Sequence, residues 1–146
     1  MEQNFSQYIE AFFYKLIELY GFKVKSELNE NQSYMIEYSS EDFVIKIEKY
    51  FKEFYASIYK VDKLDDEINL FNLLEYLKQN DDKIPKSEYF RKEQNIDECY
   101  KKQLNHISSV IYENYNLIND FYNYNYESNI IRFKIFWKSK HPELYN

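Results

Sequence analysis

The chain has few of the small residues on which many active sites depend. Of its 146 residues, one is glycine, one is cysteine and none is threonine. A phosphate-binding loop needs several glycines so that its backbone can approach the phosphate, and Gly21 cannot form one alone. With one cysteine, Cys99, the chain has neither an intrachain disulfide nor a zinc site of several cysteines. We therefore expect no nucleotide, metal or other cofactor.

Residues that could act in catalysis are equally sparse. The two histidines, His106 and His141, do not form a closely spaced metal-binding pair. Cys99 and His106 lie two helical turns apart, about 10 Å along a helix axis, which is too far for a nucleophile to contact its base. A buried thiol and a hydrogen-bonded histidine are the simpler interpretation. We expect no catalytic residues and no enzyme activity.

Long apolar runs are also missing. None approaches the roughly 18 residues that cross a bilayer, and the first residues carry acids without an early basic cluster. We expect a cytoplasmic protein without a membrane partner. The net charge of −6 disfavours direct binding of nucleic acid. The same charge favours association with a basic protein.

Aromatic residues, by contrast, are abundant. The chain has 17 tyrosines and 12 phenylalanines. So many rings can build a dense core and still leave some on the surface, where tyrosine is a preferred interface residue. The composition therefore favours a protein that binds other proteins.

The first part of the chain changes from a helical period to an alternating one. Apolar residues in 4–20 recur at intervals of three and four, which predicts a helix, and Gly21 is placed to end it. Four alternating runs with short polar links then follow within 22–61, which predicts an antiparallel meander. In the last run, Phe54, Ala56 and Ile58 should face the core, with Tyr55 and Tyr59 facing solvent.

The second part is helical. Residues 62–69 form an acidic connector, and Asn69 is a suitable N-cap for a helix over 70–79. A long apolar stripe begins near residue 87 and predicts one helix to about residue 120. Residues 128–138 fit both a strand and a helix, and we favour a helix that covers this stripe. We thus predict a single α+β domain over 1–146, in which about three C-terminal helices within 70–138 pack on one face of a four-stranded sheet.

The candidate binding residues are surface tyrosines and clustered acids. They are Tyr55, Tyr59, Asp62, Asp65, Asp66, Glu67, Asp81, Asp82, Tyr112, Tyr124 and Tyr126. Solvated loops explain the acids more simply, and a preference for tyrosine in strands explains the first two rings. The segment 112–126 holds five tyrosines and five asparagines. This bias is typical of an adaptable contact surface, but it also arises from an AT-rich genome.

The order of elements resembles a known class of protein. The stretch FFYKLIELYGFKVKSELNENQSYMIEYSSEDFVIKIEKYFKEFYASIYKVDKLDDEINLFNLLEYLKQ and the later helix ECYKKQLNHISSVIYENYNLINDF resemble small bacterial immunity-type proteins over residues 5–122. The basic tail with its single tryptophan departs from that pattern. The resemblance implies a single-domain inhibitor that binds a partner toxin and does no chemistry.

Three functions follow from these expectations. The first is an immunity-like inhibitor that blocks a basic partner protein such as a toxin. The second is a phage-encoded inhibitor of a bacterial defence nuclease. The third is an oligomeric scaffold in which the helix over 93–122 forms a dimer seam, and the sequence leaves open whether the chain is a monomer or a homodimer.

Overall fold

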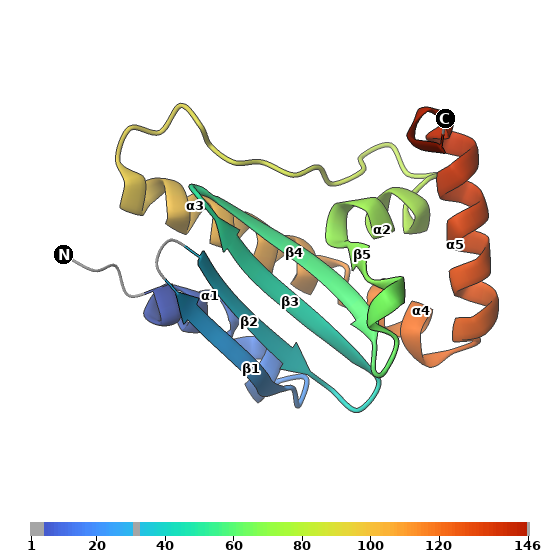
Figure 1. Cartoon of the computed structure of the whole chain (residues 1–146), viewed down its shortest axis with the longest axis horizontal. Helices are drawn as coiled ribbons and strands as arrows, with labels where there is room; N and C mark the ends of the chain where they lie inside the picture. The colour runs from blue at the N-terminus through green and yellow to red at the C-terminus, as the bar shows by residue number, and fades with distance from the viewer. Residues whose placement is uncertain (1–4, 31–32, 146) are drawn as a thin grey trace.

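Helices and one antiparallel sheet make up the fold (Figure 1). The computed structural model describes residues 5–30 and 33–145. Its elements in chain order are α1 (Phe5–Glu18), β1 (Lys23–Glu30), β2 (Ser33–Ser39), β3 (Phe43–Tyr50), β4 (Glu53–Lys60), the 3-10 turn η1 (Leu64–Asp66), β5 (Ile68–Asn69), α2 (Leu70–Leu77), α3 (Ile96–Glu113), α4 (Tyr115–Asn123), α5 (Tyr126–Lys140) and the 3-10 turn η2 (Pro142–Tyr145).

The first helix ends in the way that its glycine predicts. Gly21 has a φ of +73°, a left-handed conformation that costs glycine little because it has no Cβ. The N–H of Phe22 then donates to the carbonyl of Leu16 at 2.9 Å. This bond spans the turn at Gly21, after which the chain enters β1.

The five strands pair in sequence order, all antiparallel. The four-stranded meander is confirmed, but the sheet has a fifth strand that the sequence prediction lacked. β5 has two residues, which pair with Ser57 and Ile58 of β4. So short a strand has no alternation to detect, and its second residue, Asn69, also caps α2.

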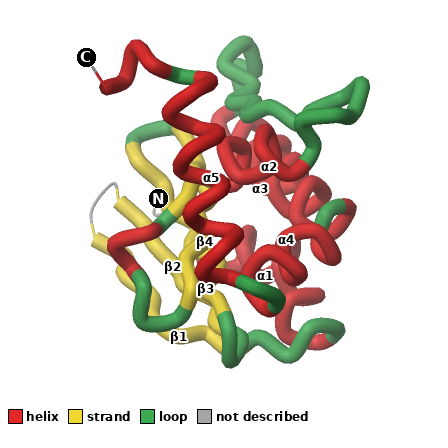
Figure 2. Tube along the Cα trace, turned by 90° about the vertical axis from the view of Figure 1, so that its right-hand side faces the viewer, coloured by secondary structure: helices red, strands yellow, loops and turns green. Residues whose placement is uncertain are grey.

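Helices cover one face of this sheet, and within residues 5–30 and 33–145 no α-helix lies on the other face. In Figure 1, α1 and α3 lie behind the strands, and Figure 2 shows the strands in a separate layer from α1 to α4. Alternate strand residues such as Ile45, Ile47 and Ile58 are fully buried against the helical layer. Phe54 and Ala56 are buried with Ile58, which confirms the predicted core face of β4.

The predicted long helix begins at Ile96 and not near residue 87, and it is two helices, because it breaks at Asn114. This residue is buried, and its side chain donates to the carbonyl of Val110 at 2.9 Å and accepts from Lys78 Nζ at 3.0 Å. The described part of the chain therefore has four α-helices after the sheet, α2 to α5, where about three were predicted. In residues 5–30 and 33–145, no helix is both long and apolar enough to cross a membrane.

The last stretch is a helix, which decides between the two expectations for 128–138. It does not lie on the sheet with α1 and α3, however. α5 packs beside α2 and α4 at the β5 end of the sheet (Figure 1). Tyr76 of α2 makes edge contacts with Phe133 and Phe136 of α5 at ring distances of 5.8 and 5.3 Å. The predicted single helical layer is wrong in this respect, because α5 buries its rings against other helices.

Candidate partner-binding surface

The sheet face without helices carries an ordered polar surface, which we call the outer face. The strand register aligns Ser26, Glu37, Lys46 and Ser57 in one row across β1 to β4. The neighbouring rows place Glu48 opposite Tyr55 and Val44 opposite Tyr59. The two strand tyrosines thus lie on the predicted side of β4, among charged residues of the adjacent strands.

Salt bridges and hydrogen bonds hold the central row together. Ser26 donates to Glu37 at 2.5 Å, and Lys46 Nζ lies 2.6 Å from Oε1 of Glu67. Glu67 also accepts from the hydroxyl of Ser57. Glu67 follows η1, so these contacts fasten the end of the acidic connector onto the outer face.

Tyr59 lies on this face but is not open to solvent. The β-bulge between Val24 and Ser26 leaves Lys25 outside the strand register. The Lys25 ammonium donates to the Tyr59 hydroxyl at 3.0 Å and lies 5.2 Å from the ring centroid. The hydroxyl in turn donates to Glu37. Tyr59 is consequently only 3% exposed, and the expectation that it is a solvent-facing ring is wrong.

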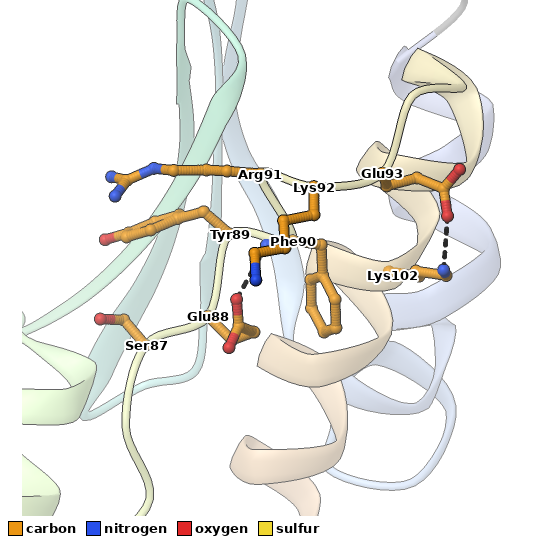
Figure 3. Close-up of a pocket in the computed structure, with 8 residues that line it drawn as sticks. All are labelled: Ser87, Glu88, Tyr89, Phe90, Arg91, Lys92, Glu93 and Lys102. Carbon is orange, nitrogen blue, oxygen red and sulfur yellow. Dashed lines mark hydrogen bonds and ion pairs between the residues drawn. The ribbon is translucent and has the colours of Figure 1, made fainter.

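Tyr55 remains partly exposed and belongs to a second cluster. Its hydroxyl donates to Glu53 at 2.8 Å, and its ring lies 5.5 Å from the ring of Tyr89. Arg91 contacts both Glu53 and Tyr89. Its Nε is 2.6 Å from the Glu53 carboxylate, and its guanidinium lies 4.9 Å from the Tyr89 ring centroid. Figure 3 shows the Tyr89 and Arg91 side chains extending side by side.

The segment between α2 and α3 supplies these last two residues. It runs along the edge of β4 at the end of the strand that β5 does not pair with. Cys99 Sγ of α3 donates to the carbonyls of Tyr89 and Phe90 at 3.3 and 3.4 Å and so attaches the segment to α3. Phe90 has a φ of +51°, and its ring contacts His106. A hollow of about 570 Å³ lies beside this attachment. Its lining residues are Lys52, Glu53, Tyr89, Arg91, Glu93, Gln94, Ile96 and Cys99.

Glu37 and Glu53 are charged acceptors at neutral pH. Burial raises the pKa of Glu37, but bonds from Ser26 and Tyr59 and the nearby lysines outweigh burial and leave it below its usual value. The bond from Arg91 similarly lowers the pKa of Glu53. The bond to Glu53, followed by burial, raises the pKa of Tyr55 to about 12. Tyr55 therefore stays a neutral donor.

The predicted acidic connector divides into paired and unpaired residues. Asp66 lies 2.6 Å from Lys134 of α5, and Glu67 is paired with Lys46. Asp62 and Asp65 are exposed and form no ion pair within the described part of the chain. Two of the four acids are thus paired with lysines of this chain. The other two, Asp62 and Asp65, are unpaired within the described residues and lie just after the end of β4.

The other predicted residues lie away from this surface. Asp81 and Asp82 are exposed in the turn after α2, where Asp81 lies 3.8 Å from Lys78. Tyr124 is 64% exposed between α4 and α5. The structure therefore does not bring these three residues to the strand tyrosines.

Tyr112 and Tyr126 are packed into the protein, contrary to expectation. The Tyr112 hydroxyl donates to the carbonyl of Phe12 at 2.7 Å, across the contact between α1 and α3. Tyr126 is buried and stacks on Tyr122 at 5.7 Å. The error with Tyr126 has a clear origin, because the helix is interrupted after α3 and again after α4. A face assigned from one continuous helix does not continue through such breaks.

Sequence reasoning missed the residues that hold the strand tyrosines in place. Lys25 and Glu37 come from β1 and β2, and Tyr89 and Arg91 come from the segment after α2. The alternation in β2 was a signal for Glu37, because it places this acid on the same face as Tyr59. Nothing in the sequence indicates the bulge that frees Lys25 or the path of residues 78–95.

The charged side chains of this surface pair with one another, as Lys46 does with Glu67 and Arg91 with Glu53. In residues 5–30 and 33–145, no three His, Cys, Asp or Glu side chains form a group that could hold a metal ion. The polar groups bind one another in fixed positions, with rings of Tyr55 and Tyr89 between them.

No family model matches this sequence, and neither a curated protein nor a solved structure matches the chain.

Proposed function

We propose that this chain is a non-catalytic inhibitor that binds a partner protein, such as a toxin, with the outer face of its sheet. The observation that carries the proposal is the fixed arrangement of Tyr55 with Glu53, Tyr89 and Arg91 on a face that no α-helix of the described residues covers. Tyrosine and arginine are enriched among the residues that dominate binding energy in protein interfaces. An immunity-like protein acts by this kind of occlusion.

Preorganisation supports the proposal. A side chain that is already held by hydrogen bonds loses less conformational entropy when a partner binds. The hydroxyl of Tyr55 is held by Glu53, and its ring packs against the ring of Tyr89. Arg91 in turn is held by Glu53. Tyr55, Tyr89 and Arg91 can therefore bind a partner without a change of side-chain conformation.

Charge supports a basic partner. The chain has a net charge of −6. Asp62 and Asp65 carry charges that no ion pair neutralises within the described ranges, and they lie beyond the end of β4. Complementary fields of this kind increase the rate of association more than the final affinity.

The scaffold alternative has less support. Its dimer seam was the apolar stripe over 93–122, yet this stripe faces inward. Tyr100, Leu104, Ile107 and Ile111 of α3 are all buried in the protein's own core. A dimer would need another surface.

A growth-rescue and pull-down screen against toxin genes that neighbour this gene tests the proposal. We expect one such protein to be captured and its toxicity suppressed. Tyr55→Ser should weaken that complex at least about tenfold, because it removes an aromatic anchor. Tyr14→Ser is the matched control, since Tyr14 is an exposed tyrosine of α1 on the opposite side of the sheet.

Two results would contradict the proposal. One is a screen without a partner, accompanied by turnover of a small substrate by the purified protein. The other is a partner whose affinity falls with Tyr14→Ser and not with Tyr55→Ser. That second result would move the interface to the helical side.

A further inference from the structure

Helix α5 is apolar on two opposite faces. Its inner face buries Tyr126, Ile130 and Phe133. On the solvent side, Ile131 and Ile135 are 56% and 66% exposed. Large apolar side chains that lie next to one another on an exposed surface indicate a contact with another molecule. Within the described part of the chain, nothing covers this second face.

The helical repeat places the two isoleucines in the middle of the solvent side. At 3.6 residues per turn, Ile131 and Ile135 are neighbours on one row and lie roughly opposite Phe133 and Trp137. Residues four apart form the ridge that fits between the side chains of a second helix. Glu127 and Ser139 continue the same row at either end, and both are exposed.

Cations border this ridge on both sides. The repeat places Lys134 and Lys138 along one side and Arg132 along the other. Lys134 already binds a carboxylate, that of Asp66 in η1, at 2.6 Å. Arg132 and Lys138 form no ion pair in residues 5–30 and 33–145, although Lys138 lies 5.7 Å over the Tyr145 ring.

We infer that the exposed face of α5 is a docking site for an acidic amphipathic helix of a partner protein. The apolar stripe of that helix would cover Ile131 and Ile135, and its acids would pair with Arg132 and Lys138. The inference does not depend on the outer face of the sheet, because α5 lies with α2 and α4 at the β5 end.

Charge argues against the other possible occupants. A second copy that paired α5 with α5 about a two-fold axis would bring Arg132, Lys134 and Lys138 against the same cations, and like charges in contact oppose binding. An anionic membrane would attract these cations, but the net charge of −6 opposes its approach. An acidic helix matches both the ridge and its border.

Selection from a phage-displayed library of random peptides against the purified chain tests the inference. We expect the enriched peptides to carry acids beside apolar residues at helical spacing. Their affinity, measured by fluorescence polarisation, should fall about tenfold for Ile131→Ser/Ile135→Ser, which removes apolar contact area. The variant Arg132→Glu/Lys138→Glu should lose at least as much. Both variants should unfold at the same urea concentration as the wild type, because these side chains are exposed.

Matched controls lie on other helices. Ile17→Ser removes an exposed isoleucine of α1, and Lys101→Glu reverses an exposed lysine of α3. Both should bind the selected peptides as the wild type does. Enriched peptides that lack acids, or that bind the α5 variants unchanged, would overturn the inference, and so would a library without enrichment.

Two further measurements distinguish an acidic helix from a membrane and from a second copy of the chain at the exposed face of α5. Sedimentation with phosphatidylserine-containing vesicles that is abolished by the α5 variants, without peptide enrichment, would show a membrane site and overturn the inference. Light scattering that reveals a dimer lost in Ile131→Ser/Ile135→Ser would assign the face to a second copy and overturn it as well.

Discussion

The side-chain amide of Gln103 accepts a hydrogen bond from the backbone N–H of Phe54 at 2.8 Å. Its Nε2 also donates to the carbonyl of Lys52 at 2.9 Å. Gln103 is fully buried in α3, whereas Lys52 lies in the β3–β4 turn and Phe54 near the start of β4. One amide therefore fixes the β3–β4 hairpin to the helical layer beside the hairpin turn, and so also sets the position of Glu53 in the proposed binding surface.

Gln103→Leu should lower the free energy of unfolding by about 2–3 kcal/mol, because it removes two hydrogen bonds to buried or half-buried backbone groups. Urea denaturation followed by circular dichroism measures this change. Gln94→Leu is the control, since Gln94 is exposed, and it should change the stability by less than about 0.5 kcal/mol. Equal effects of the two substitutions would contradict the role assigned to the buried amide.

Gly21→Ala should cost about 1 kcal/mol of stability. An added Cβ at this position meets no atom within 4 Å, so the cost is confined to the left-handed backbone at φ +73°. Gly21→Asn should cost less, because asparagine tolerates this conformation. Thermal and urea unfolding of the two variants gives the comparison. A larger loss for asparagine than for alanine would show that backbone conformation is not the controlling factor.

Phe51→Gly should leave the fold as stable as the wild type or stabilise it by up to about 1 kcal/mol. Phe51 occupies the first central position of the two-residue β3–β4 turn, with a φ of +55°. Hairpin turns of this kind favour glycine there. The ring is largely exposed and contacts Tyr50 at a centroid distance of 4.4 Å. A clear loss of stability in urea would mean that this ring contact outweighs the backbone strain.

Glu37→Gln should destabilise the protein at neutral pH by about 1–2 kcal/mol, because it weakens bonds from Ser26 and Tyr59 to a charged acceptor. The pKa of Glu37 is lower in the folded chain than the usual value near 4.3. The carboxylate therefore stabilises the fold above about pH 4.3, and this contribution is lost as the pH falls through the folded pKa.

Urea denaturation at a series of pH values measures this dependence. The difference between wild type and Glu37→Gln should be largest near neutral pH and should shrink below about pH 4. Glu41→Gln is the control, because Glu41 is exposed and forms no ion pair within the described residues. A difference for Glu37→Gln that is constant over this range would show that the ionised carboxylate does not contribute.

Local sequence patterns predicted most of the elements. The helical spacing before Gly21, the alternation in β2 to β4 and the N-cap at Asn69 each depend on neighbouring residues alone. The inward side of β4 followed from the same alternation. Asn114 was harder, because its helix break is stabilised by Lys78 from another element. Local helix propensity does not include that bond.

The sequence by itself determined the α+β class, the order of the strands and the side of β4 on which Tyr55 and Tyr59 lie, because these depend on periods of two and 3.6 residues. Only the tertiary structure decided which tyrosines are exposed. Lys25 covers Tyr59 of β4 from a bulge in β1, three strands away. Tyr89 reaches Tyr55, and Arg91 reaches Glu53, from the segment that follows α2. Exposure is a property of such long-range contacts, and a local repeat cannot specify them.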